Sequence, residues 1–236
     1  FRRACDAVDY AHRNLVVHRD IKPSNVFVTS SDEVKLLDFG IAKLLRSGET
    51  SAGAPVTRTG FHPMTPEYAA PEQVTGGPIT TAPDVYALGV LLFELLTGVR
   101  PAPAGAASSG AATAAAAVVP STAIGGRTRA RAGEPDADAL ARAHARSTSP
   151  ARLRRLLQGD LDTIVAMALR EEPGRRYPSA GQLSEDIERA LAGRPVRAQR
   201  DTASYRLRRF VRRHWGGDGL ATAPSVALRG LLALSI

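Results

Sequence analysis

The pattern of apolar and polar residues predicts a mostly helical chain with one small pair of strands. Apolar residues recur at helical spacing from the start of the chain, on one face of an opening helix: Phe1, Ala4, Cys5, Val8 and Ala11. Two short apolar runs, at 26–28 and 34–37, flank the polar residues 30–33, which is typical of strands joined by a turn. The chain begins inside a helix and is therefore expected to be a piece of a larger protein.

Three further segments have helical patterns. Residues 84–97 carry apolar side chains around most of a helix, which predicts deep burial, and Gly98 and Pro101 end the run. A second segment, 156–169, places its apolar residues on one face before Pro173 stops it. In the last helix, Ser179 and Gln182 can form a capping box ahead of a buried stripe made of Leu183, Ile187 and Leu191.

The segments between these helices have a different composition. Residues 40–80 are rich in Thr, Gly and Pro and predict a long ordered loop. Residues 102–150 contain few large apolar side chains, so little offsets the entropy of ordering them. We therefore divide the chain into an ordered part at 1–100, a disordered low-complexity insert at 101–155 with one helix near 136–145, ordered helices at 156–197, and a tail at 198–236.

Composition narrows the cellular setting and the classes of partner. The single cysteine, Cys5, permits no internal disulfide, and with no signal peptide visible this indicates a reducing, cytoplasmic location. The net charge of +8 is concentrated late in the chain, where a basic run, Arg206–Arg213, fits either a solvated helix face or an anionic membrane surface. The apolar tail at 220–236 is only marginally long and contains Pro224 and Arg229, so we do not assign a membrane span to it. Our hypothesis is that it is a truncated anchor at the inner face of a membrane. No recognition motif accompanies the arginines, so no specific nucleic acid is expected.

Three short motifs point to phosphoryl transfer. The segment His18-Arg19-Asp20-Ile21-Lys22-Pro23-Ser24-Asn25 places an aspartate and an asparagine four intervening residues apart. Asp38-Phe39-Gly40 follows the second predicted strand, and Ala70-Pro71-Glu72 comes later. Three motifs in this order resemble the protein kinase family, over residues 1–100 and 156–195, with bacterial serine/threonine kinases the most similar.

The resemblance implies a protein kinase-like α+β fold. Its mostly helical C-terminal lobe would carry the small hairpin, and the segment Asp84-Val85-Tyr86-Ala87-Leu88-Gly89 resembles the family's central buried helix. The N-terminal lobe is expected to be absent, because neither a Gly-x-Gly-x-x-Gly-x-Val loop nor a Val-Ala-Ile-Lys motif occurs.

The resemblance also implies a reaction, in which the γ-phosphate of ATP passes to Ser or Thr hydroxyls of protein substrates. Asp20 would accept the hydroxyl proton and Lys22 would neutralise charge on the γ-phosphate. Asn25 and Asp38 would hold Mg²⁺, which prefers hard oxygen ligands. Thr65 would hydrogen-bond both Asp20 and Lys22.

Other residues are assigned regulatory or structural roles by the same resemblance. Arg19 would sense phosphate on Thr57 or Thr59 and order the loop. Glu72 and Arg176 would form a buried ion pair that fixes the loop rather than touching substrate.

Two hypotheses on activity remain open. The missing lobe predicts that the chain alone neither binds ATP tightly nor phosphorylates proteins, although the parent enzyme would. The rival is a non-catalytic module, pseudokinase-like or truncated, that only binds partners. A glycine-rich loop and a strand lysine encoded upstream of Phe1 would favour the enzyme.

Overall fold

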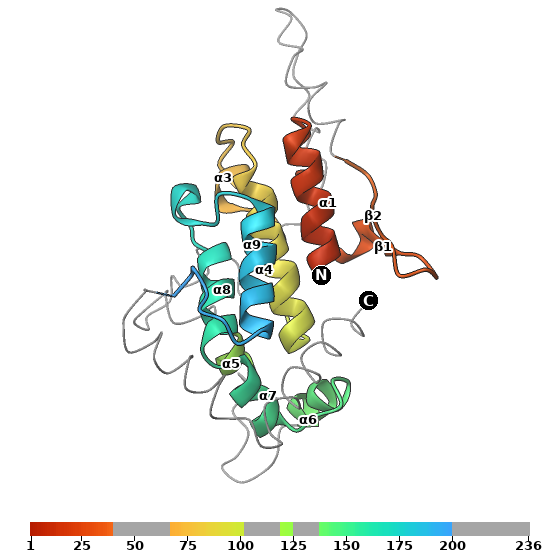
Figure 1. Ribbon diagram of the computed structural model, residues 1–236, viewed down its shortest axis with the longest axis vertical. Coiled ribbons are helices and arrows are strands. Elements are labelled where there is room, and N and C mark those ends of the chain that lie inside the picture. Colours follow the sequence, from red (N-terminus) through yellow and green to blue (C-terminus); the bar gives the residue numbers. More distant parts are fainter. Residues whose placement is uncertain (40–66, 102–118, 125–136, 200–236) are drawn as a thin grey trace, which may run out of the picture.

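The computed structural model describes residues 1–39, 67–101, 119–124 and 137–199, and helix α4 (Ala82–Thr97) lies at their centre (Figure 1). Nearly every residue of α4 is buried, and the side chains of Leu88, Leu92 and Leu96 are fully enclosed. A helix that is apolar on all sides is stable only where other elements cover it. Gly98 ends it with a left-handed φ of 74°, and its N–H donates to the carbonyl of Glu94. The predicted central helix is thus confirmed.

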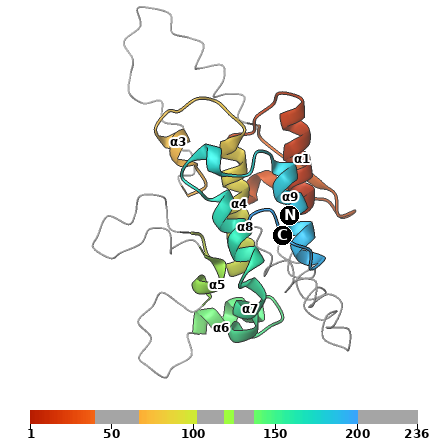
Figure 2. The ribbon, with the colours of Figure 1, turned by 60° about the vertical axis from the view of Figure 1, so that its left-hand side comes forward.

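Helices α1 (Arg2–Arg13) and α9 (Ala180–Leu191) pack against each other beside α4, as Figures 1 and 2 both show. The predicted face of α1 is buried, and Ser179 caps α9 by accepting a hydrogen bond from the N–H of Gln182 at 3.2 Å. Cys5 is fully buried in α1, and this burial raises the pKa of its thiol. Since the reactive thiolate is disfavoured there, Cys5 acts as a small core residue.

The sheet is a single antiparallel pair, β1 (Val26–Val28) and β2 (Val34–Leu36), in which Val26 lies opposite Leu36. Strand β2 contacts α1, and the short 3₁₀ helix η1 (Pro23–Asn25) leads directly into β1. The predicted hairpin is confirmed. Its position matters because it holds one end of the segment 18–25 while α1 holds the other.

The predicted disorder of residues 101–155 is wrong for the parts of this stretch that the structure describes. Helix α6 (Ala137–His144) confirms the one helix predicted near 136–145. Two further short helices, α5 (Pro120–Ala123) and α7 (Pro150–Leu157), occur or begin where disorder was expected. The three helices lie together at one end of α4 (Figure 2). Ile124, Ala143 and Leu153 are buried in the common core. A few well-placed apolar residues therefore order a segment whose average composition predicts disorder.

Arg146 adds a second reason for this order. Its guanidinium donates twice to the carbonyl of Leu95, at 2.8 and 3.1 Å, and so satisfies the C-terminal end of α4. Burial lowers the pKa of Arg146, and the nearby Arg142 lowers it further.

The helical segment predicted over 156–169 is interrupted. Helix α7 ends at Leu157 and α8 (Asp160–Ala168) begins three residues later. The break falls at Gly159, whose φ of 108° lies outside the helical region and suits glycine alone. Helix α8 then packs against both α4 and α9.

Gly89 permits the close approach of α4 and α8. A Cβ at this position would lie 2.8 Å from the Cβ of Ala168 and 3.1 Å from a methyl of Leu169. We expect Gly89→Ala to lower the free energy of unfolding by about 1–3 kcal/mol, because the two helices would have to separate. Chemical denaturation of the purified protein measures this. Gly174→Ala is the control, since a Cβ there meets nothing within 4 Å; equal midpoints for both variants would contradict the prediction.

Within the described ranges, no helix combines the length and apolarity needed to cross a membrane. The basic run 206–213 and the tail 220–236 lie outside the described residues, so their assignment to a membrane surface stays a prediction.

Candidate active site

The segment between α1 and β1 brings three of the predicted site residues together. The Lys22 ammonium lies 3.0 Å from the Asp20 carboxylate, at Oδ2. The Asn25 side-chain amide donates to the same oxygen at 3.3 Å and to the Asp20 carbonyl at 2.8 Å. Asn25 is buried, whereas Asp20 and Lys22 are partly exposed. A cation, a carboxylate and an amide thus meet at one accessible point.

His18 connects this segment to the end of β2. Its ring is buried, and Nε2 lies 2.9 Å from the Leu37 carbonyl while Nδ1 accepts from the Asp20 N–H at 3.3 Å. A carbonyl only accepts and an N–H only donates, so the imidazole carries its proton on Nε2 and is neutral. The His18 ring therefore fixes both the backbone of Asp20 and the residue that precedes Asp38.

Asp38 lies immediately beyond this connection. The N–H of Leu37 donates to the Asn25 carbonyl at 2.9 Å, and the Leu37 carbonyl is the one that His18 contacts. Leu37, the residue before Asp38, is therefore held by both His18 and Asn25. Asp38 is exposed and adopts a left-handed φ of 54°. The next residue, Phe39, stacks at a tilt on the His18 ring, with 4.6 Å between the centroids. The motif is thus anchored on both sides of an exposed carboxylate.

Asp84 holds the start of the segment 18–25 by hydrogen bonds to its backbone. It lies in the first turn of α4, fully buried, and accepts the N–H of His18 at 2.8 Å and the N–H of Arg19 at 2.7 Å. The His12 ring lies 2.8 Å from the same carboxylate. Three donors converge on one buried carboxylate, so Asp84 holds the backbone at the start of the segment.

Arg19 combines an unusual backbone with an unused donor. Its φ of 67° is in the left-handed region, which residues with a Cβ seldom adopt. Its Nη1 is buried and, among the described residues, has no hydrogen-bond partner. Such a donor is suited to an incoming anion.

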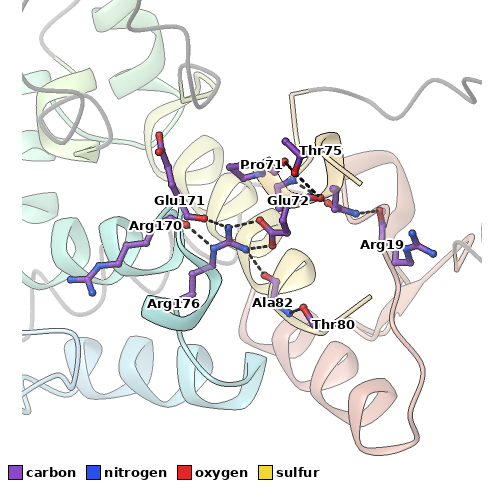
Figure 3. A network of polar contacts seen from close by, with 11 residues as sticks. Arg19, Pro71, Glu72, Thr75, Thr80, Ala82, Arg170, Glu171 and Arg176 are labelled. Atoms are coloured by element: carbon purple, nitrogen blue, oxygen red, sulfur yellow. Dashed lines mark hydrogen bonds and ion pairs between the residues drawn. The ribbon is translucent and has the colours of Figure 1, made fainter. Parts of the chain in front are cut away.

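The ion pair expected between Glu72 and Arg176 is present and bidentate (Figure 3). The two N–H···O distances are 2.5 and 2.7 Å, although 104 positions of sequence separate the residues. The Arg176 side chain is fully buried, donates to the carbonyls of Arg170, Glu171 and Ala82, and lies 4.9 Å from the Tyr86 ring centre. This pair joins the short helix α3 (Pro71–Val74) to the C-terminal helices through the turn η3 (Pro173–Arg175).

Three predicted residues, Thr57, Thr59 and Thr65, lie outside the described residues. Conversely, two residues that contact the site were not singled out from the sequence. His18 stands inside the first motif, which was a usable signal, and Gln73 directly follows the third motif.

Several known proteins are similar to this chain over most of its length. The family model described as the protein kinase domain matches residues 1–177. Serine/threonine-protein kinase PknB of Mycobacterium tuberculosis is 30% identical over 195 residues, which cover 83% of this chain and 26% of that protein. Kinase PknA of Corynebacterium glutamicum is 30% identical over 81% of this chain and 33% of its own length. A probable serine/threonine-protein kinase of Streptomyces coelicolor is 34% identical over 81% of this chain and 24% of its own length.

Among solved structures, the kinase domain of Mycobacterium tuberculosis PknI aligns with a TM-score of 0.44 and 23% identity, over 79% of this chain and 51% of that chain. The chain spans between about a quarter and a third of the length of the related kinases. The family model, by contrast, matches well over half of this chain. The chain therefore belongs to the protein kinase family, and its relatives there include bacterial serine/threonine kinases.

Proposed function

We propose that these residues form the C-terminal lobe of a kinase that transfers the γ-phosphate of ATP to Ser and Thr hydroxyls of proteins. The observation that carries the proposal is the mutual contact of Asp20, Lys22 and Asn25, beside a loop that carries Asp38. Phosphoryl transfer depends mainly on positioning and on charge stabilisation, and this cluster supplies both.

Asp20 is the group that receives the hydroxyl proton in this proposal. Lys22 and Asn25 both contact its Oδ2, so we assign the other oxygen, Oδ1, to the acceptor hydroxyl. Lys22 is close enough to Asp20 to serve the reacting phosphate from the same side. Thr65 is proposed to complete this group by hydrogen bonds to Asp20 and Lys22.

The donor set fits Mg²⁺. The Nδ2 of Asn25 donates to Asp20, so the Oδ1 of Asn25 is oriented as an acceptor. Asp38 presents an exposed carboxylate. Magnesium takes hard oxygen ligands and is usually bound by one or two protein groups together with substrate phosphates. Asn25 and Asp38 would hold it, and the ion would neutralise charge on the phosphates of ATP. The exposed Phe27 ring, on the strand that follows Asn25, offers an apolar surface for the base.

Arg19 is proposed to read the phosphorylation state of Thr57 or Thr59. Its buried, unused Nη1 supports this, because a phosphate would satisfy the donor with a charge-assisted hydrogen bond.

We also propose a cytoplasmic setting, where ATP is available; contact of residues 206–213 with an anionic membrane surface stays a prediction.

The test uses the full-length gene product, incubated with γ-labelled ATP, Mg²⁺ and a protein acceptor. We expect label on Ser and Thr, and none when a chelator removes the metal. Asp20→Asn should lower kcat by about a hundredfold or more, the range for loss of a positioned acid or base. Asp32→Asn is the matched control, because Asp32 lies exposed in the hairpin turn with a φ of 60°, which asparagine tolerates.

A folded full-length product that binds protein partners but transfers no label would contradict the proposal and favour the non-catalytic module. Equal rates for the wild type and Asp20→Asn would contradict the assignment of Asp20 alone.

A further inference from the structure

The peptide unit between Arg19 and Asp20 is held from a second segment of the chain by Gln73. The Gln73 side-chain amide donates to the Arg19 carbonyl at 3.1 Å, across 54 positions of sequence. We propose that Gln73 is a positioning residue that sets the orientation of this peptide and thereby of the Asp20 carboxylate. The inference rests on the proposed function only for its kinetic consequence.

Both ends of the Gln73 amide are occupied. Its Nε2 donates to Arg19, and its Oε1 accepts from the N–H of Ala70 at 3.0 Å, one residue before α3 begins. The second bond satisfies a free N–H at the start of the helix. It also removes the freedom of the side chain to rotate, so the donor points in a fixed direction at the Arg19 carbonyl.

The peptide that Gln73 reaches is fixed on its other side by His18. The carbonyl of the Arg19–Asp20 peptide accepts from Gln73, while its N–H donates to the Nδ1 of His18 at 3.3 Å. The left-handed φ of Arg19 is costly and persists only where surrounding contacts hold it. Asp84 holds the N–H of Arg19, but it does not touch the peptide that follows. Gln73 supplies the contact that Asp84 cannot.

The backbone of Gln73 is held in place through its neighbour, Glu72. Glu72 forms the bidentate pair with the buried Arg176, and in Figure 3 Arg19 and Arg176 lie on opposite sides of Glu72. Helix α3 has four residues, too few to be stable alone. Adjacent side chains of α3 thus tie it outward to the C-terminal helices and inward to the segment that carries Asp20.

Four variants separate the two bonds of Gln73. Gln73→Glu keeps the acceptor for Ala70 but replaces the donor with an oxygen that repels the Arg19 carbonyl. Gln73→Met removes both bonds, and Gln73→Lys removes the acceptor while restoring a donor. Thr75→Ala is the control at the C-terminal cap of the same short helix, because among the described residues its hydroxyl contacts only the carbonyls of Pro71 and Glu72.

Two readouts are taken on the full-length product. The first is backbone hydrogen exchange at residues 18–25, which needs no kinase activity. Exchange of the Asp20 N–H should be about tenfold faster in Gln73→Glu and Gln73→Met than in the wild type. Gln73→Lys and Thr75→Ala should exchange at the wild-type rate. The second is kinetic: kcat should fall about tenfold in the two variants without a donor, with the KM for ATP within threefold and with recovery in Gln73→Lys.

The outcomes are distinguishable from those of the proposed function. Unchanged exchange of the Asp20 N–H in Gln73→Glu overturns the inference. An equal fall in kcat and an equal rise in exchange in Gln73→Met and Gln73→Lys also overturns it, because Gln73 would then act only as a helix cap. If the wild type transfers no phosphate, the proposed function fails, while the exchange data still decide whether Gln73 orients the peptide.

Discussion

Replacing Glu72 with alanine is expected to lower the free energy of unfolding by about 3 kcal/mol, because it leaves the buried Arg176 guanidinium without its carboxylate. The value lies at the low end of the range for a broken buried pair. Three carbonyls, of Arg170, Glu171 and Ala82, continue to accept from the same guanidinium. Chemical denaturation of the purified protein, with circular dichroism as the signal, measures the change.

A double-mutant cycle separates the pair from its surroundings. Arg176→Met removes the charge but keeps part of the volume, so the double variant with Glu72→Ala should be less destabilised than the sum of the single variants. We expect a coupling energy of at least about 1 kcal/mol. Strictly additive losses would show that the two side chains do not stabilise each other.

The exposed pair between Arg2 and Glu188 is the matched control. Its two side chains are about half exposed, so solvent screens their attraction, and Glu188→Ala should change stability by less than about 1 kcal/mol. A loss in this variant as large as that of Glu72→Ala would contradict the argument from burial.

Asp84→Asn is expected to cost about 3 kcal/mol of stability and to loosen the segment that carries Asp20. The amide oxygen can replace Oδ2, which lies close to the His12 ring and accepts the N–H of His18. The amide nitrogen then faces the N–H of Arg19, donor against donor, at a site with no access to water. A buried donor left without an acceptor, in place of a bond to a charged group, accounts for a cost of this size.

Denaturation and hydrogen exchange at residues 18–20 together test this prediction. Faster exchange at Arg19 together with a lower midpoint is the expected result, and Asp32→Asn again serves as the control because that carboxylate is exposed. If Asp84→Asn were as stable as the wild type, with unchanged exchange at Arg19, the support that we assign to Asp84 would be wrong.

Much of the fold was predictable because its signals are local. Helical spacing identified the buried face of α1 and the central helix α4, and the apolar runs identified the hairpin. The three motifs in order pointed to Asp20, Lys22 and Asn25 as one group, and the structure places these residues in contact. The contact between Glu72 and Arg176 was expected from the family resemblance.

Other features depend on contacts between distant segments and could not be read from local patterns. The ordering of α5 and α7 arises from a few buried residues, such as Ile124 and Leu153, that composition averaged over about fifty residues conceals. The bond from Gln73 to Arg19 requires α3 to lie beside the segment 18–25, which no spacing in the chain implies.

The sequence by itself determined which elements form and which residues could carry phosphoryl transfer, because helical periodicity and motif spacing are properties of short stretches. Only the tertiary structure decided how the side chains and backbone groups of those residues are oriented. The protonation of His18, the left-handed turn at Arg19 and the orientation of the Asp20 peptide are each set by donors and acceptors from other elements. Hydrogen bonds are directional over about 3 Å, so only the folded arrangement of α3, α4 and the hairpin can supply them.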